Sequence, residues 1–102
     1  MGFPAKDAEL KPVGSNFSTT LAADPTVYQQ TAAVATAVAA AVGSYVDALD
    51  ALTEARANGV RSEQMTATKN QARDEMLNLL RPIYSFVQDS TTISDTAKIA
   101  LG

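Results

Sequence analysis

The longest helical pattern in the chain runs from residue 31 to residue 59. Its larger apolar side chains recur at spacings of three and four residues, which is typical of an α-helix with one apolar stripe. Thr31 is suited to cap the first turn, and Asn58-Gly59 offers the left-handed residue at which helices end. The pattern predicts a helix over residues 32–57. Its stripe consists of Val34, Val38, Val42, Tyr45, Leu49 and Leu52.

A second face of this predicted helix carries only small residues. Ala32, Ala35, Ala39 and Gly43 follow one another at spacings of three, four and four. A neighbouring backbone can therefore come unusually close to this face. Two interpretations remain open, namely close helix packing inside one small domain and self-association of the chain.

The segments on either side are predicted to be helices that pack against residues 32–57. Residues 1–7 are predicted to be an extended lead-in, and Asp7 is a candidate cap for a helix over residues 8–23. Asp24-Pro25 is a helix-start signal, so residues 25–29 are expected to form a single tight turn. Tyr28 in this turn is expected to be a packed aromatic with its hydroxyl at the surface. The stripe of the first helix consists of Leu10, Val13, Phe17 and Leu21.

A third helix is predicted over residues 63–88, with Ser62 as its candidate N-cap. Pro82 lies inside the pattern, where its ring removes one backbone hydrogen bond and clashes with the preceding turn. We expect a kink near Pro82, and a break into two helices is the alternative. After a loop, Ser94 is suited to cap a last short helix over residues 95–101. The apolar face of the third helix consists of Met65, Ala72, Met76, Leu79, Leu80, Ile83, Phe86 and Val87.

These elements predict one all-α domain over residues 8–102. Short connections force neighbouring helices to run in opposite directions, so the three long helices are expected to form an up-down-up antiparallel bundle. The short last helix is expected to close one end. No run of alternating apolar and polar residues indicates a strand.

Composition narrows the functional classes. The chain has 102 residues, a net charge of −3, no histidine and no cysteine. Nucleic acid is not an expected partner, because its phosphates need a clustered basic face. The usual general base, the commonest metal ligand and thiol chemistry are all absent, so we predict no catalytic residue, no metal and no cofactor. No small-molecule substrate is evident.

No targeting or membrane segment is expected either. The N-terminus lacks a basic region followed by an apolar run, so no signal peptide is visible. The alanine-rich run of residues 31–46 is short for a membrane span and leads directly into Asp47 and Asp50. These features are compatible with the cytoplasm or with an assembled particle.

The most distinctive polar residues lie on the predicted third helix. They are Lys69, Asn70, Arg73 and Arg81. The acidic side chains Asp47, Asp50 and Glu54 are available on the central helix, which favours a polar seam between the two helices. An anion or partner-protein site is the second interpretation, and catalysis is the third. Asn16 is a candidate for a hydrogen bond to Asn70.

Short motifs spread over nearly the whole chain resemble an uncharacterised bacterial family of small helical proteins. That family shows NF, PxxYxxT, KNxAR and RP elements in this order, and the resemblance implies no activity. The residues that carry it are Asp7, Asn16-Phe17, Pro25, Tyr28, Thr31, Tyr45, Lys69-Asn70, Ala72-Arg73, Arg81-Pro82, Asp95 and Leu101-Gly102.

The sequence favours a non-enzymatic structural or protein-interaction module that belongs to a larger assembly, such as a virion or another particle. Its partners would be proteins, including further copies of itself. A soluble monomeric adaptor or regulator that binds a partner through a helix groove is the alternative. An enzyme would have to work through carboxylate, tyrosine or lysine side chains alone.

Overall fold

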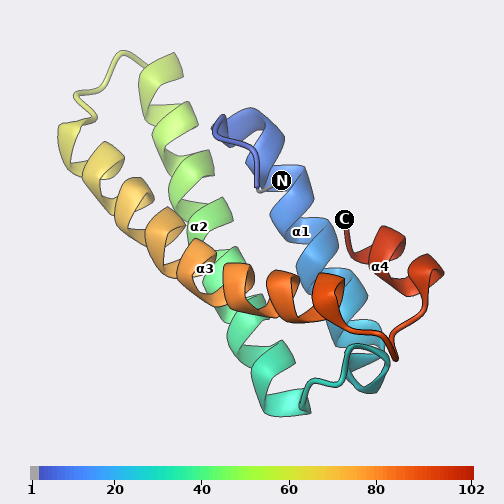
Figure 1. The fold of residues 1–102 in the computed structure, drawn as a ribbon. Helices are drawn as coiled ribbons and strands as arrows, with labels where there is room; N and C mark the ends of the chain where they lie inside the picture. Colours follow the sequence, from blue (N-terminus) through green and yellow to red (C-terminus); the bar gives the residue numbers. More distant parts are fainter. Residues whose placement is uncertain (1–2) are drawn as a thin grey trace.

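A computed structural model describes residues 3–102, and no strand occurs among them (Figure 1). The chain forms α1 (Asp7–Ala23), the 3-10 turn η1 (Pro25–Tyr28), α2 (Ala32–Ala57), α3 (Glu63–Asp89) and α4 (Asp95–Leu101). The all-α class is therefore confirmed, as are the three long helices, the short fourth helix and the tight turn after Pro25. The first helix begins at Asp7, one residue earlier than predicted.

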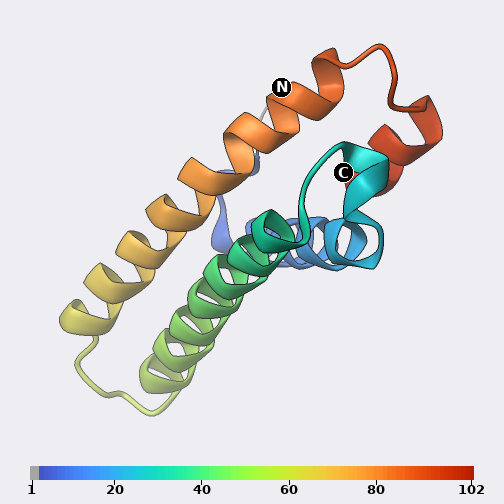
Figure 2. The ribbon, with the colours of Figure 1, turned by 90° about the horizontal axis from the view of Figure 1, so that it is seen from below.

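The helix α2 is the element that both other long helices approach most closely. Figures 1 and 2 both show α3 beside α2. In the view of Figure 1, α2 runs opposite to α1 and α3, whereas Figure 2 shows α1 crossing α2 obliquely. α4 lies against α1. The result is an elongated molecule of 50 × 26 × 18 Å.

Two of the four predicted N-caps are confirmed. The Thr31 hydroxyl accepts from the backbone N–H of Val34 at 3.2 Å, and the Ser94 hydroxyl accepts from that of Ala97 at 3.2 Å. Both capping residues have the extended backbone that brings the side chain over the first turn. The predicted end of α2 is also confirmed, since Gly59 adopts the left-handed conformation at which helices end, with a φ of 70°.

Neither of the other two candidates, Asp7 and Ser62, forms a side-chain cap, although Ser62 does occupy the predicted position. Ser62 occupies the N-cap position of α3, but its φ of −127° and ψ of 11° depart from the extended cap conformation, and it makes no side-chain cap hydrogen bond. Lys6 occupies the N-cap position of α1, also without a side-chain cap. Asp7 is the first residue of that helix, and its carboxylate bonds to side chains of α2 and α3.

The helix α3 continues through Pro82 without a break into two helices. Proline donates no backbone hydrogen bond, so the carbonyl of Asn78 loses its usual partner there. Figure 1 shows that the axis of α3 changes direction partway along the helix. Phe86 is 47% exposed, contrary to the prediction. It precedes the buried Val87 by one residue and so lies about 100° away from it around the helix.

One hydrophobic core joins all the helices. Leu77 belongs to it although the predicted stripe omitted it, because α3 also buries residues next to Met76 and Leu80. The core residues are Leu10, Phe17, Leu21, Tyr28, Ala35, Val38, Val42, Tyr45, Met76, Leu77, Leu80, Ile83, Val87, Ile93 and Leu101.

The small-residue face of α2 is turned largely away from the other helices. Ala35 is buried, but Ala32 and Ala39 are exposed, and a Cβ atom at Gly43 would meet no described atom within 4 Å. The interpretation as close packing inside the domain therefore holds for Ala35 but not for Ala32 and Ala39. The helix instead turns larger side chains such as Val38 and Tyr45 inward, because burying them gains more free energy.

Candidate functional site

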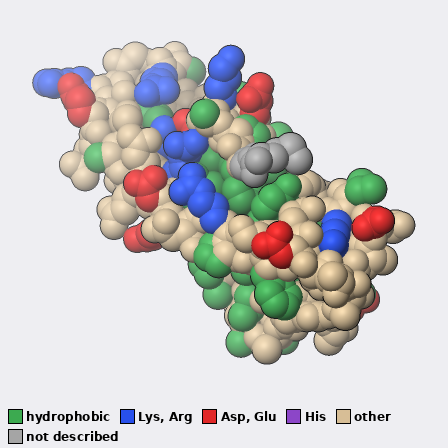
Figure 3. All heavy atoms as spheres, in the orientation of Figure 1, with side chains coloured by type: hydrophobic (Ala, Val, Ile, Leu, Met, Phe, Trp, Pro, Cys, Tyr) green, Lys and Arg blue, Asp and Glu red, His purple; other side chains and the backbone are tan. Residues whose placement is uncertain are grey.

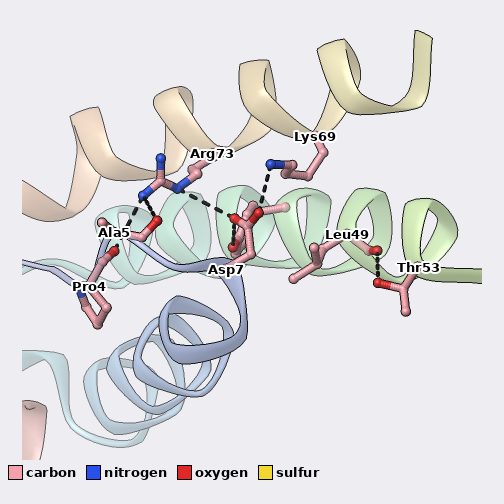
Figure 4. A network of polar contacts seen from close by, with 8 residues as sticks. Pro4, Ala5, Asp7, Leu49, Thr53, Lys69 and Arg73 are labelled. Carbon is pink, nitrogen blue, oxygen red and sulfur yellow. Dashed lines mark hydrogen bonds and ion pairs between the residues drawn. The ribbon is translucent and has the colours of Figure 1, made fainter. Parts of the chain in front are cut away.

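The carboxylate of Asp7 is the centre of a polar cluster that joins the three long helices (Figure 4). Its Oδ1 accepts from the hydroxyl of Tyr45 in α2 at 2.6 Å. Its Oδ2 accepts from the ammonium group of Lys69 in α3 at 2.7 Å. The Nε atom of Arg73 lies 3.7 Å from Oδ1. We call these four residues, Asp7, Tyr45, Lys69 and Arg73, the Asp7 cluster.

Lys69 and Arg73 follow one another by four residues and therefore lie on the same side of α3. Two cations in this arrangement repel each other, and Asp7 supplies the negative charge between them. Lys69 is the most deeply buried charged residue described, with 8% exposure. A lysine this deep needs a partner, because removing its charge from water costs several kcal/mol.

Arg73 extends the cluster to the segment before α1. Its Nη2 atom donates to the carbonyl of Ala5 at 2.8 Å and weakly to that of Pro4 at 3.4 Å (Figure 4). Its Nε is buried and has no hydrogen-bond partner among the described residues. The guanidinium is thus anchored by Asp7 on one side and by main-chain carbonyls on the other.

The cluster changes the acidity of two of its members. Burial alone would raise the pKa of Asp7, but the hydrogen bonds from Lys69 and Tyr45, together with the charges of Lys69 and Arg73, hold that pKa below its usual value. The pKa of Tyr45 is raised, first by burial and then by its hydrogen bond to the Asp7 carboxylate. Asp7 is therefore ionised and Tyr45 protonated at neutral pH, so the tyrosine remains a donor.

The structure brings together only part of the predicted polar set. Lys69 and Arg73 meet at Asp7, whereas Asn70 and Arg81 are exposed. The prediction that these residues pair with acidic residues of the central helix is wrong for Lys69 and Arg73, because both pair with Asp7 of α1. Asp50 forms its ion pair with Lys11 of α1, at 2.7 Å.

Sequence reasoning missed Asp7 and Tyr45 as members of the cluster. Tyr45 was placed in an apolar stripe, which is correct for its ring, while its hydroxyl supplies the polar contact. Asp7 lies 62 residues from Lys69, so no local pattern connects them. The signal that was present is the pair of cations four residues apart, which a nearby anion would stabilise.

A second polar group fixes α4 to the rest of the molecule. The amide of Asn16 donates to the carbonyls of Ala100 and Leu101 at 3.0 and 3.2 Å, so the expected bond to Asn70 is wrong. The Tyr28 hydroxyl donates to the carbonyl of Ala97 at 2.8 Å and is not left at the surface. Burial, followed by the charge of Asp24, raises the pKa of Tyr28. The two bonds from Asn16 satisfy free carbonyls at the end of α4, and all three bonds hold a helix too short to be stable alone.

The small-residue face of α2 borders a shallow groove of about 270 Å³. Its walls are short side chains from the end of α1, from η1 and from the first half of α2, so it has a predominantly apolar lining. The lining residues are Ala22, Pro25, Ala32, Ala35, Thr36 and Ala39. Ala35 and Ala39 are two of the predicted interaction residues. The third, Gly43, lies one turn further along the same helix.

The helix α2 also meets the length and composition expected of a membrane-crossing helix. Only 22% of its most apolar 18-residue window is buried. The core helix of a soluble protein passes the same test, so this property is weak evidence for a membrane span. The expectation of no membrane span stays a prediction.

Chemically, these sites offer hydrogen bonding and apolar contact. Among residues 3–102, no three His, Cys, Asp or Glu side chains lie close enough to hold a metal ion. Comparison of the chain with protein-family models, with curated proteins and with solved structures found no match.

Proposed function

We propose that this protein is a non-enzymatic structural or protein-interaction module that associates with further copies of itself through the small-residue face of α2. The supporting observation is that much of this face is exposed in the uncharged first half of α2. Residues 31–46 contain no charged side chain, and most of the alanines among them are exposed. Contiguous exposed apolar patches on soluble proteins mark contact sites with partners.

The same face suits close contact between helices. Side chains at Ala39 and Gly43 extend no further than a methyl group, so a second helix could approach the backbone of α2 closely. The exposed charges of this helix, including Asp47 and Glu54, lie in its second half. A partner helix placed over the first half therefore avoids the cost of burying an unpaired charge.

A role within a virion or another particle is the form of assembly that we propose, by analogy with other small helical proteins. The resemblance to a bacterial family of small helical proteins is part of this proposal and adds no activity to it. An enzymatic role is not proposed, since the conspicuous ionisable side chains, Asp7, Tyr45 and Lys69, are bonded to one another.

Ala39→Glu tests self-association. Size-exclusion chromatography with light scattering should show the mass of the wild-type chain rising with concentration, and the mass of the variant should rise less because a carboxylate would be buried in the α2 contact. Ala51→Glu is the matched control, because residue 51 is also an exposed alanine of α2 but lies outside the small-residue face. A wild-type chain that stays monomeric at high concentration would contradict the proposal.

The second candidate is an adaptor that binds a partner protein through a helix groove. A groove of about 280 Å³ between α3 and α4 favours it, lined by Tyr84, Gln88, Lys98, Ile99 and Gly102. Ile99 is 79% exposed there, which is unusual for a large apolar side chain. A stable monomer that loses a captured partner on Ile99→Asp substitution would favour this candidate over self-association.

A further inference from the structure

Residues 3–6, which we call the arm, lie over the core before α1 begins. The ring of Phe3 packs edge-on against Phe17 of α1, with centroids 6.0 Å apart, and against Tyr84 of α3, with centroids 5.4 Å apart. Phe17 is 1% exposed, so the arm contributes one wall of its surroundings. Aromatic pairs in this geometry add to the stability gained from burial itself.

The backbone of the arm is held by a cation. Arg73 donates to the carbonyls of Ala5 and Pro4, groups that every extended peptide carries. Asp7 lies against the other side of the same guanidinium, so Arg73 is already oriented for this contact. Figure 3 shows Lys and Arg side chains gathered beside a strip of hydrophobic side chains on this face.

None of these contacts needs the arm to be continuous with the helix that follows. Pro4 favours an extended backbone and donates no hydrogen bond, and the junction at Lys6 has no side-chain cap. A peptide from outside that offers an aromatic residue followed by proline can make the same ring contacts and the same two carbonyl contacts. The arm therefore contacts this site as a separate peptide ligand would, although it is covalently joined to α1.

We infer that Phe17, Tyr84 and Arg73 form a binding site for an extended aromatic-proline peptide, and that the arm of a second copy occupies this site in the assembled protein. The arm is chosen as the occupant because it is the sequence whose fit the structure shows. Reciprocal exchange of arms gives a closed pair with identical contacts in both copies. Residues 3–6 span about 13 Å when extended, so the two copies must lie close together at this face.

This inference identifies a contact between copies in the proposed self-association. Only the claim that the arm comes from a second copy rests on that proposal. The small-residue face of α2 contributes no residue to the site. Arm exchange can therefore be measured in an Ala39→Glu background, which separates failure of the α2 proposal from failure of this one.

The first test uses full-length, isotope-labelled Phe3→Ala protein, whose site has lost its own aromatic ring. Titration with the peptide Gly-Phe-Pro-Ala-Lys should shift the amide resonances around Phe17, Tyr84 and Arg73. The control peptide Gly-Ala-Pro-Ala-Lys should bind about tenfold more weakly or worse, because it buries no ring. Absence of shifts at millimolar peptide, or equal shifts with both peptides, would overturn the site.

The second test replaces the peptide with unlabelled full-length wild-type protein, and unlabelled Phe3→Ala protein is the control. The same resonances should shift with the wild-type chain alone. Shifts with the peptide but not with the wild-type chain would overturn the second copy as the occupant. If Phe3→Ala fails to fold, labelled wild-type protein with excess peptide gives the answer, since the peptide must then compete with the attached arm for the same resonances.

Discussion

The carboxylate of Asp7 accepts hydrogen bonds from side chains of both α2 and α3, so one residue of α1 links the three long helices. Its partners Tyr45 and Lys69 are themselves buried, at 0% and 8% exposure. Removing the carboxylate would leave a buried ammonium group without its anion, which is more costly than losing the hydrogen bonds alone.

Asp7→Asn should lower the free energy of unfolding at pH 7 by about 2 kcal/mol, because the amide keeps the size of the side chain but loses its charge. The folded-state pKa of Asp7 lies below its unfolded value, so its contribution is present above about pH 4 and is lost as the pH falls through the folded-state pKa. The difference between variant and wild type should therefore shrink in acid. Urea unfolding at pH 7 and at pH 3 measures it.

Asp47→Asn is the control for this prediction, since Asp47 is exposed and forms no ion pair with any residue from 3 to 102. It should change stability by less than about 0.5 kcal/mol. Equal effects of the two substitutions at pH 7 would contradict the role assigned to Asp7.

At the scale of the helices, the termini differ in how their free backbone groups are satisfied. Thr31 bonds to the first turn of α2 through its hydroxyl, whereas Ser62 makes no such bond at the start of α3. Both residues belong to the types that cap helices, so composition alone does not separate them. The backbone conformation of the cap residue decides whether the side chain reaches the N–H groups.

Thr31→Ala should therefore lower the free energy of unfolding by about 1 kcal/mol, because an N–H group of the first turn of α2 loses its acceptor. Ser62→Ala should cost only a few tenths of a kcal/mol, since no cap bond is lost. Thermal unfolding of both variants, followed by circular dichroism, gives the comparison. A larger loss for Ser62→Ala than for Thr31→Ala would contradict this assignment of the caps.

At the scale of the whole molecule, the main question is what covers the exposed apolar surface of α2. Tyr45 and Val38 place one side of the helix in the core, and the small-residue face lies roughly a third of a turn further around the helix. The helix α2 could cross a membrane only if it left its contacts with α1 and α3. Asp47 and Asp50 would then approach the hydrocarbon region, at a cost that rises steeply with depth.

We therefore expect the full-length protein to stay in the supernatant when it is sedimented with phosphatidylcholine vesicles. Its circular dichroism should be the same with and without vesicles, because the core contacts of α2 persist. Vesicles that contain anionic lipid are the control for simple charge attraction, which the net charge of −3 opposes. Sedimentation with neutral vesicles would contradict the expectation and return α2 to consideration as a membrane helix.

The sequence by itself determined the helices, because their signals are local. Spacings of three and four residues defined α1, α2 and α3, Thr31 and Ser94 marked two starts, and Gly59 marked the end of α2. Each of these signals acts within a few residues along the chain, so it can be read without knowledge of the neighbours.

Only the tertiary structure decided which side chains meet. Asp7 pairs with Lys69 across 62 residues, Asn16 holds the carbonyls of α4, and the small-residue face of α2 points outward. A charged side chain pairs with whichever opposite charge the packing brings near, and several acidic residues were equally available in the sequence. A helix with two apolar faces can turn either one inward, and α2 buries the larger side chains because they gain more from leaving water.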